Sequence, residues 1–96
     1  MKAYRSLVKF AMTNNCTVSV WDGEEWQVSR SRKPSEIISA IESVEAAGLT
    51  IRDGEGKWVA SADVSAFGLA DDETVIDWSV SPFMDQWEVG YFSFGL

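Results

Sequence analysis

The chain has 96 residues, a formal net charge of −7, no histidine and a single cysteine, Cys16. This length predicts one domain that buries roughly 65% of its unfolded surface, which is enough for a core without metals or disulfides. The missing histidine removes the commonest general base and zinc ligand, and no cofactor is expected. The lone cysteine, with no signal-like or membrane-spanning apolar run, predicts a cytoplasmic protein without a membrane partner.

The acidic excess lies entirely in the last part of the chain. Residues 1–57 carry eight basic and eight acidic side chains, whereas residues 58–96 carry seven acidic and no basic ones. Eight of the twelve aromatic residues also fall within residues 58–96. We therefore expect an acidic and aromatic C-terminal surface, which either contacts a basic partner or only keeps the protein solvated.

An amphipathic helix is predicted over residues 2–13, where apolar side chains recur at helical spacing: Tyr4, Leu7, Val8, Ala11 and Met12. A hairpin follows over about residues 17–30. Its turn is expected at residues 22–24, which pairs Val20 with Trp26 and Val18 with Val28. The basic residues after it, Arg30, Arg32 and Lys33, are expected to form a solvated linker without nucleic-acid contacts.

A second helix is predicted over residues 36–47, capped by Ser35 and stopped by Gly48, with four apolar residues facing the core: Ile37, Ile38, Ile41 and Val44. The second hairpin covers about residues 49–66. A turn at residues 53–56 would pair Ile51 with Trp58 and Leu49 with Ala60. The return strand alternates, with one side made of Trp58, Ala60, Ala62, Val64 and Ala66 and the other of Val59, Ser61, Asp63 and Ser65.

The two hairpins share one pattern: an apolar alternation, then Asp-Gly-Glu, then a tryptophan. Asp-Gly between alternating runs is a strong hairpin signal, because glycine accepts positive φ and aspartate bonds its own backbone. Each hairpin follows a predicted helix, which suggests an αββ duplication. Convergence of two amphipathic hairpins is the alternative.

A fifth strand is predicted over residues 74–80, with Ile76, Trp78 and Val80 on one side and Val75, Asp77 and Ser79 on the other. A short helix starts at Pro82. The order αββαβββα predicts a single α+β domain over residues 1–96, with a largely antiparallel five-stranded sheet covered by helices on one face.

The segment VSAFGLADDETVIDWSVSPFMDQW, residues 64–87, resembles small acidic uncharacterised proteins of tailed bacteriophages, in which an Asp-Glu-Thr-Val strand and a tryptophan-bearing terminal segment recur. The resemblance covers about a quarter of the chain and carries no activity or site residue. It implies a bacteriophage protein acting in the host cytoplasm.

The sequence therefore predicts a non-enzymatic accessory protein that binds a host or phage protein with a basic surface. The residues expected to contact it are Asp71, Asp72, Glu73, Asp77, Asp85, Trp87 and Glu88. One alternative is a structural or self-associating protein. Another is a DNA mimic, although seven uncompensated charges fall short of the roughly 19 phosphates on B-DNA of the same length.

Acidic loops offer weaker hypotheses. A metal site or a carboxylate-based hydrolase would need the acids at residues 71–73 and Asp77 to converge, and no EF-hand pattern is present. Cys16 is expected to be a small buried apolar residue.

Trp21 lies on the strand face opposite Val18 and Val20. If helices cover only one face, Trp21 and Val59 need a covering element or a second subunit. The apolar tail of Phe92, Phe94 and Leu96 raises the same question, so a homodimer is possible.

Overall fold

Five antiparallel strands form one sheet in the order β2-β1-β3-β4-β5, which confirms the α+β class, the strand count and the element order. The computed structural model describes residues 1–94. Its elements are α1 (Ala3–Thr13), β1 (Thr17–Trp21), β2 (Trp26–Ser31), α2 (Pro34–Glu42), β3 (Ala47–Arg52), β4 (Trp58–Val64), the 3₁₀ turn η1 (Asp71–Glu73), β5 (Val75–Trp78) and α3 (Pro82–Phe94).

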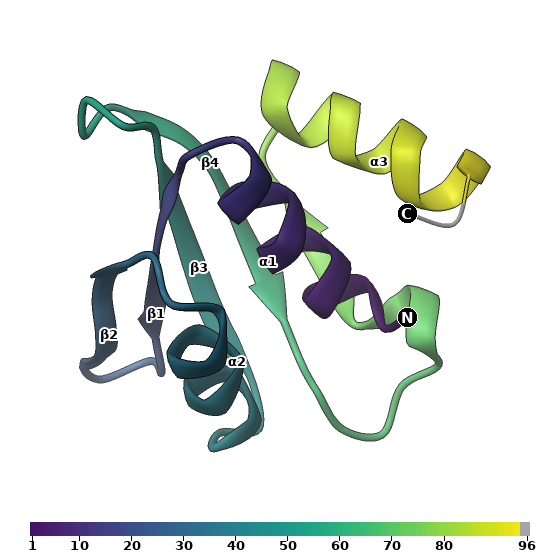
Figure 1. Cartoon of the computed structure of the whole chain (residues 1–96). Coiled ribbons are helices and arrows are strands. Elements are labelled where there is room, and N and C mark those ends of the chain that lie inside the picture. Colours follow the sequence, from purple (N-terminus) through teal and green to yellow (C-terminus); the bar gives the residue numbers. More distant parts are fainter. Residues whose placement is uncertain (95–96) are drawn as a thin grey trace.

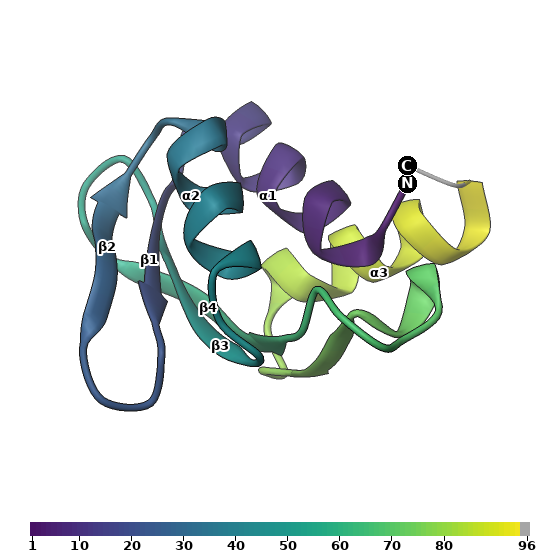
Figure 2. The same cartoon turned by 90° about the horizontal axis from the view of Figure 1, so that it is seen from below.

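All three helices lie on the same face of the sheet (Figures 1 and 2). α1 and α2 cover the first four strands, and α3 lies beside α1 over the β4–β5 side. The core forms between these two layers from inward side chains of both, among them Leu7, Val18, Val20, Ile37, Leu49 and Ile51. The other face of the sheet carries no helix (Figure 2), and we call it the open face.

The first hairpin has a longer turn than the sequence predicted. The Asp22 N–H donates to the carbonyl oxygen of Glu25 at 3.1 Å, so the turn spans four residues, 22–25. Trp26 therefore pairs with Trp21, and Val28 pairs with Val20. The predicted pairings of Val20 with Trp26 and of Val18 with Val28 are both wrong, because the Asp22 side chain holds the extra residue in the turn; Val18 pairs with Ser31.

The second hairpin deviates in the same way. The Asp53 N–H donates to the Lys57 carbonyl at 2.8 Å, and Trp58 pairs with Arg52. A bulge follows, after which Ala60 pairs with Ile51. The bulge turns Trp58 away from the core, so that the side chain is 50% exposed instead of lining the core with Ala60 and Ala62 as predicted.

The β1–β3 pairing relates the two αββ units by a pseudo-two-fold axis normal to the sheet. Ser19 pairs with Thr50 at the centre; Trp21 pairs with Gly48 on one side, and Arg52 pairs with Thr17 on the other. Arg52 occupies the place in the second unit that Trp21 occupies in the first, just before the Asp-Gly turn. This register favours the predicted duplication.

α2 begins and ends earlier than predicted. Pro34 stands in the first turn and Lys33 is the N-cap, so Ser35 is inside the helix and does not cap it. The helix ends at Glu42, and Gly48 is a residue of β3 and not the helix stop. Proline fixes φ in the first turn and so determines where the helix begins. From Ala47 onward the residues alternate between buried and partly exposed positions and belong to β3.

The last strand is shorter than predicted and contains a bulge. Val64 pairs with Val75, and Asp63 pairs with Asp77, so Ile76 is the extra residue. Val75 consequently faces the core on the same side as Trp78, although the sequence grouped it with Asp77. Ile76 is 55% exposed and does not share the side of Trp78 as predicted. α3 is longer than the short helix expected and buries Met84 and Trp87.

Candidate binding groove on the open face

One row of side chains crosses all five strands of the open face. The paired positions run from Trp26 through Trp21, Gly48 and Asp63 to Asp77. Because residues directly opposite on neighbouring strands project to the same side of a sheet, these side chains share the open face. They line a shallow groove of about 510 Å³ that also includes Thr50 and Ser61. We call this feature the open-face groove.

Two indoles form one wall of the groove. The rings of Trp21 and Trp26 meet edge to face with their centroids 4.9 Å apart. The turn between them is held by Asp22, whose Oδ1 accepts the N–H groups of Glu24 and Glu25, both at 2.7 Å. These backbone bonds, with the Gln27 amide donating to Oδ2 at 2.6 Å, lower the pKa of Asp22. Trp26 thus covers part of Trp21 and leaves it half-buried.

Gly48 forms the floor of the groove. A Cβ placed on it would lie 3.8 Å from the Asp63 Oδ1 and 3.8 Å from the Trp21 Cβ. Both distances are ordinary van der Waals contacts, and the backbone there does not adopt a positive φ. The sheet itself therefore does not require glycine at this position, and the missing side chain leaves the groove open.

Two carboxylates form the other wall. Asp63 and Asp77 are directly opposite on β4 and β5, and both are exposed. The Trp78 N–H donates to Asp77 Oδ1 at 2.9 Å, and within residues 1–94 neither aspartate has an ion-pair partner. Like charges placed directly opposite on a sheet destabilise it. A cation bound between them would remove this repulsion.

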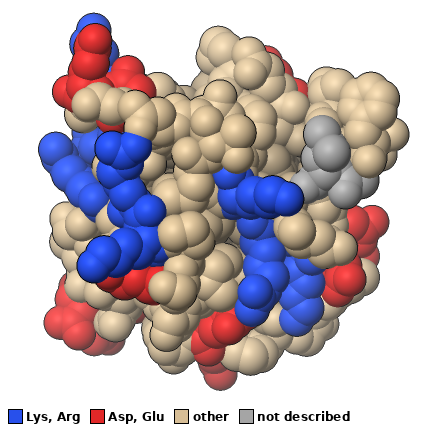
Figure 3. Space-filling model, in the orientation of Figure 1, with Lys and Arg blue, Asp and Glu red and all other residues tan. Residues whose placement is uncertain are grey.

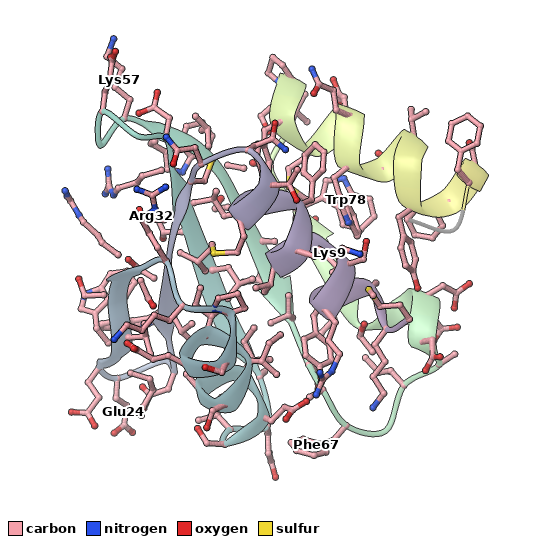
Figure 4. All side chains as sticks on the ribbon, viewed as in Figure 1. Lys9, Glu24, Arg32, Lys57, Phe67 and Trp78 are labelled. Carbon is pink, nitrogen blue, oxygen red and sulfur yellow. The ribbon has the colours of Figure 1, made fainter. Side chains whose placement is uncertain are left out.

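Basic side chains gather around the second turn, away from the groove. The Arg52 Nη1 donates to the Gly56 carbonyl at 3.3 Å, and an Arg30 Nη1 lies 3.7 Å from where a Gly56 Cβ would stand. Figure 4 shows Lys57 and Arg32 at this end of the sheet and Glu24 at the other end. The same turn also carries Asp53 and Glu55, and Glu55 pairs with Lys57 at 3.7 Å, so the basic excess at this end is partly neutralised.

The predicted contact residues do not form one surface. Asp71, Asp72 and Glu73 form η1, near Tyr91, whose pKa is raised by burial and by the charges of Asp71 and Asp72. Asp85 and Glu88 are exposed on α3, on the helical side of the sheet, whereas Asp77 is on the open face. On the face drawn in Figure 3, acidic side chains lie at several separate places around basic ones.

Trp87 is a core residue, so its predicted role in an exposed contact surface is wrong. It is 2% exposed, stacks on Tyr91 with 5.6 Å between centroids, and donates from Nε1 to the Ser6 Oγ at 3.2 Å. Trp78 packs against it edge to face at 5.7 Å, in the space between α1 and α3 (Figure 4). Trp78, Trp87 and Tyr91 thus attach α3 to the sheet. The other half of the C-terminal aromatic residues expose much of their surface, among them Trp58, Phe67, Phe92 and Phe94.

The sequence placed Trp21 and Asp63 on outward faces of their strands, and the structure confirms both. It missed the groove because the pairing of β1 with β3 was not predicted. That pairing alone brings Trp21 next to Gly48 and, through β3, next to Asp63. The sequence did not indicate that β1 and β3 are neighbours at the centre of the sheet.

The tail residues Phe92 and Phe94 are 50% and 73% exposed, and Leu96 lies outside the described residues. Cys16 is buried as predicted, and burial raises its pKa. In the described part of the chain, no three His, Cys, Asp or Glu side chains are grouped to hold a metal ion, and no helix is long and apolar enough to cross a membrane.

No family model, curated protein or solved structure matches this chain.

Proposed function

We propose that this chain is a non-enzymatic binding protein that holds a basic segment of another protein in the open-face groove. The observation that carries the proposal is the pair of facing carboxylates, Asp63 and Asp77, which have no cationic partner among residues 1–94 and lie across Gly48 from two indoles. Such an arrangement destabilises the free sheet, and a positively charged ligand would compensate for it.

The proposed partner is still a protein with a basic surface, as expected from the sequence, but the residues proposed to bind it are different. Asp77 belongs to both the predicted and the proposed surface, whereas Asp63, Trp21 and Trp26 replace the residues of η1 and α3. The dispersed acids do not favour a DNA mimic, which needs a dense continuous charge array. The resemblance to small phage proteins would make the partner a host or phage protein, and this stays a prediction.

Selection from a random peptide display library tests the proposal. Wild-type protein should enrich peptides that carry Arg or Lys, and D63N/D77N should lose this enrichment. The matched control is D85N/E88Q, which also removes two negative charges, but from α3, and should select the same peptides as the wild type. Peptides without basic residues, or identical selection by D63N/D77N, would contradict the proposal.

Self-association is a second candidate, favoured by the opposite charge at the far end of the same face. Two open faces packed about a two-fold axis would bring Arg52 of one copy toward the aspartates of the other. Sedimentation velocity at low and at high salt tests this. A dimer that dissociates with added salt and is lost in both R52Q and D63N/D77N would support it, whereas a monomer at low salt would exclude it.

A further inference from the structure

We infer, on the basis of the proposed function, that the groove takes one arginine side chain of the partner. The guanidinium lies between Asp63 and Asp77, and the aliphatic stem crosses Gly48 against Trp21. Gly48 keeps the path of the stem open, because it places no side chain between Trp21 and Asp63.

The spacing fits a single long side chain. The Trp21 Cβ and the Asp63 Oδ1 each lie 3.8 Å from the position of an added Gly48 Cβ, on its two sides. One extended basic side chain can therefore contact the indole with its methylene groups and reach the carboxylate with its charged end. A single side chain therefore spans the floor of the groove from the indole to the carboxylate.

The carboxylate pair fits a guanidinium better than an ammonium. Residues directly opposite on neighbouring strands have Cβ atoms about 4.5–5.5 Å apart, so the two acids can approach one planar group from adjacent directions. Arginine presents five N–H donors in a rigid fork and binds carboxylates in a bidentate way, whereas lysine is a compact charge that prefers full hydration. With the guanidinium held by these two strands, the methylene groups of the arginine stem pack on the indole of Trp21.

The pseudo-two-fold symmetry supplies a comparison within the molecule. Gly48 is paired with Trp21, and the equivalent of Gly48 in the first unit is Thr17, which is paired with Arg52. The sheet accommodates threonine at the equivalent position, yet has glycine where the indoles and carboxylates face each other. Glycine inside a strand often marks a place where another group approaches closely.

The test is the affinity of the intact protein for three blocked tripeptides, Gly-Arg-Gly, Gly-Lys-Gly and Gly-citrulline-Gly, measured by NMR titration. Citrulline has the length of arginine but no charge. Arginine should bind at least about fivefold more tightly than lysine, and citrulline should not bind, because only the guanidinium offers charged donors to both carboxylates.

Gly48→Thr should weaken arginine binding by about tenfold or more, because it installs the side chain that Thr17 supplies in the other unit and closes the floor. Gly48→Ala, whose added methyl group makes only ordinary contacts, is the milder second variant and should retain most of the affinity. An unchanged dispersion of the amide spectrum shows that both variants fold.

Equal affinity for arginine and lysine, or full affinity in a folded G48T protein, would overturn the inference. If D63N/D77N still abolishes selection of basic peptides, the proposed function stands without the arginine site. If neither G48T nor D63N/D77N affects the binding of basic peptides, the arginine site and the proposed function are both contradicted.

Discussion

Asp22 determines how the two groove indoles are presented. Its carboxylate accepts two backbone N–H groups and the Gln27 amide, and it thereby fixes the four-residue turn between Trp21 and Trp26. These bonds stabilise the ionised form, with the Glu25 N–H contributing most, and they lower the pKa. A single partly buried residue therefore controls one wall of the site.

Asp22→Ala is expected to loosen the turn and weaken the near-ultraviolet circular dichroism signal from the Trp21–Trp26 contact. Asp22→Asn should have a smaller effect, because an amide oxygen still accepts the backbone bonds. An unchanged signal in the alanine variant would show that the turn does not depend on this side chain.

The Asp22 pKa also has a measurable consequence. Because its folded pKa is lower than its unfolded pKa, the stabilisation is present above the unfolded value of about 3.9 and is lost as the pH falls through the folded value. A carboxyl titration followed by NMR should give Asp22 a pKa below that of a model aspartate. A value at or above it would contradict the hydrogen-bonded turn.

At the scale of elements, α1 and α2 are joined by a polar contact at the edge of the core. The Tyr4 hydroxyl, on a side chain that is 1% exposed, donates to Glu42 Oε2, and Arg5 pairs with the same oxygen at 2.6 Å. The pKa of Glu42 is lowered, chiefly by the Tyr4 hydrogen bond, and the pKa of Tyr4 is raised, chiefly by burial. The contact therefore fixes how the two helices lie relative to each other.

Tyr4→Phe is expected to lower the free energy of unfolding by about 1 kcal/mol, because it removes a hydrogen bond to a carboxylate that is partly solvated. Glu42 has a lowered folded pKa, so its contribution is present above its unfolded value and is lost as the pH falls through the folded value. Urea unfolding at neutral and acidic pH measures both effects. A Tyr4→Phe penalty that is the same at both pH values would argue against the contact.

α3 is attached mainly through Trp87. Replacing this buried indole by alanine should cost about 3–5 kcal/mol, because it removes the contacts to Trp78 and Tyr91 and leaves a cavity. Phe94→Ala is the control, since this ring is 73% exposed and its loss should change stability by less than about 0.5 kcal/mol. Comparable losses in the two variants would contradict the packing described here.

For the whole molecule, hydrophobic periodicity predicted the element order, the inward side chains of α1 and the single covered face of the sheet. It failed at Trp26, Trp58 and Ile76, because turn length and bulges depend on side-chain bonds and on partner strands. The groove was beyond prediction for the same reason: it requires the β1–β3 pairing, which joins residues distant in sequence.

The facing aspartates predict opposite effects on stability and on binding. D63N/D77N should be as stable as the wild type or more stable by about 0.2–1 kcal/mol at low salt, because the cross-strand repulsion is gone, while affinity for basic peptides is lost. Urea unfolding at low ionic strength measures the first effect. A clear loss of stability would show that the two carboxylates have a structural role in the free protein.

Chemical-shift mapping with a basic peptide tests most directly whether the open face is the binding surface. We predict shifts of the Gly48 amide and of the Trp21 and Trp26 indole N–H groups, with the resonances of α1 and α3 unchanged. Shifts confined to α3 and η1, or no shifts at all, would contradict the proposed site.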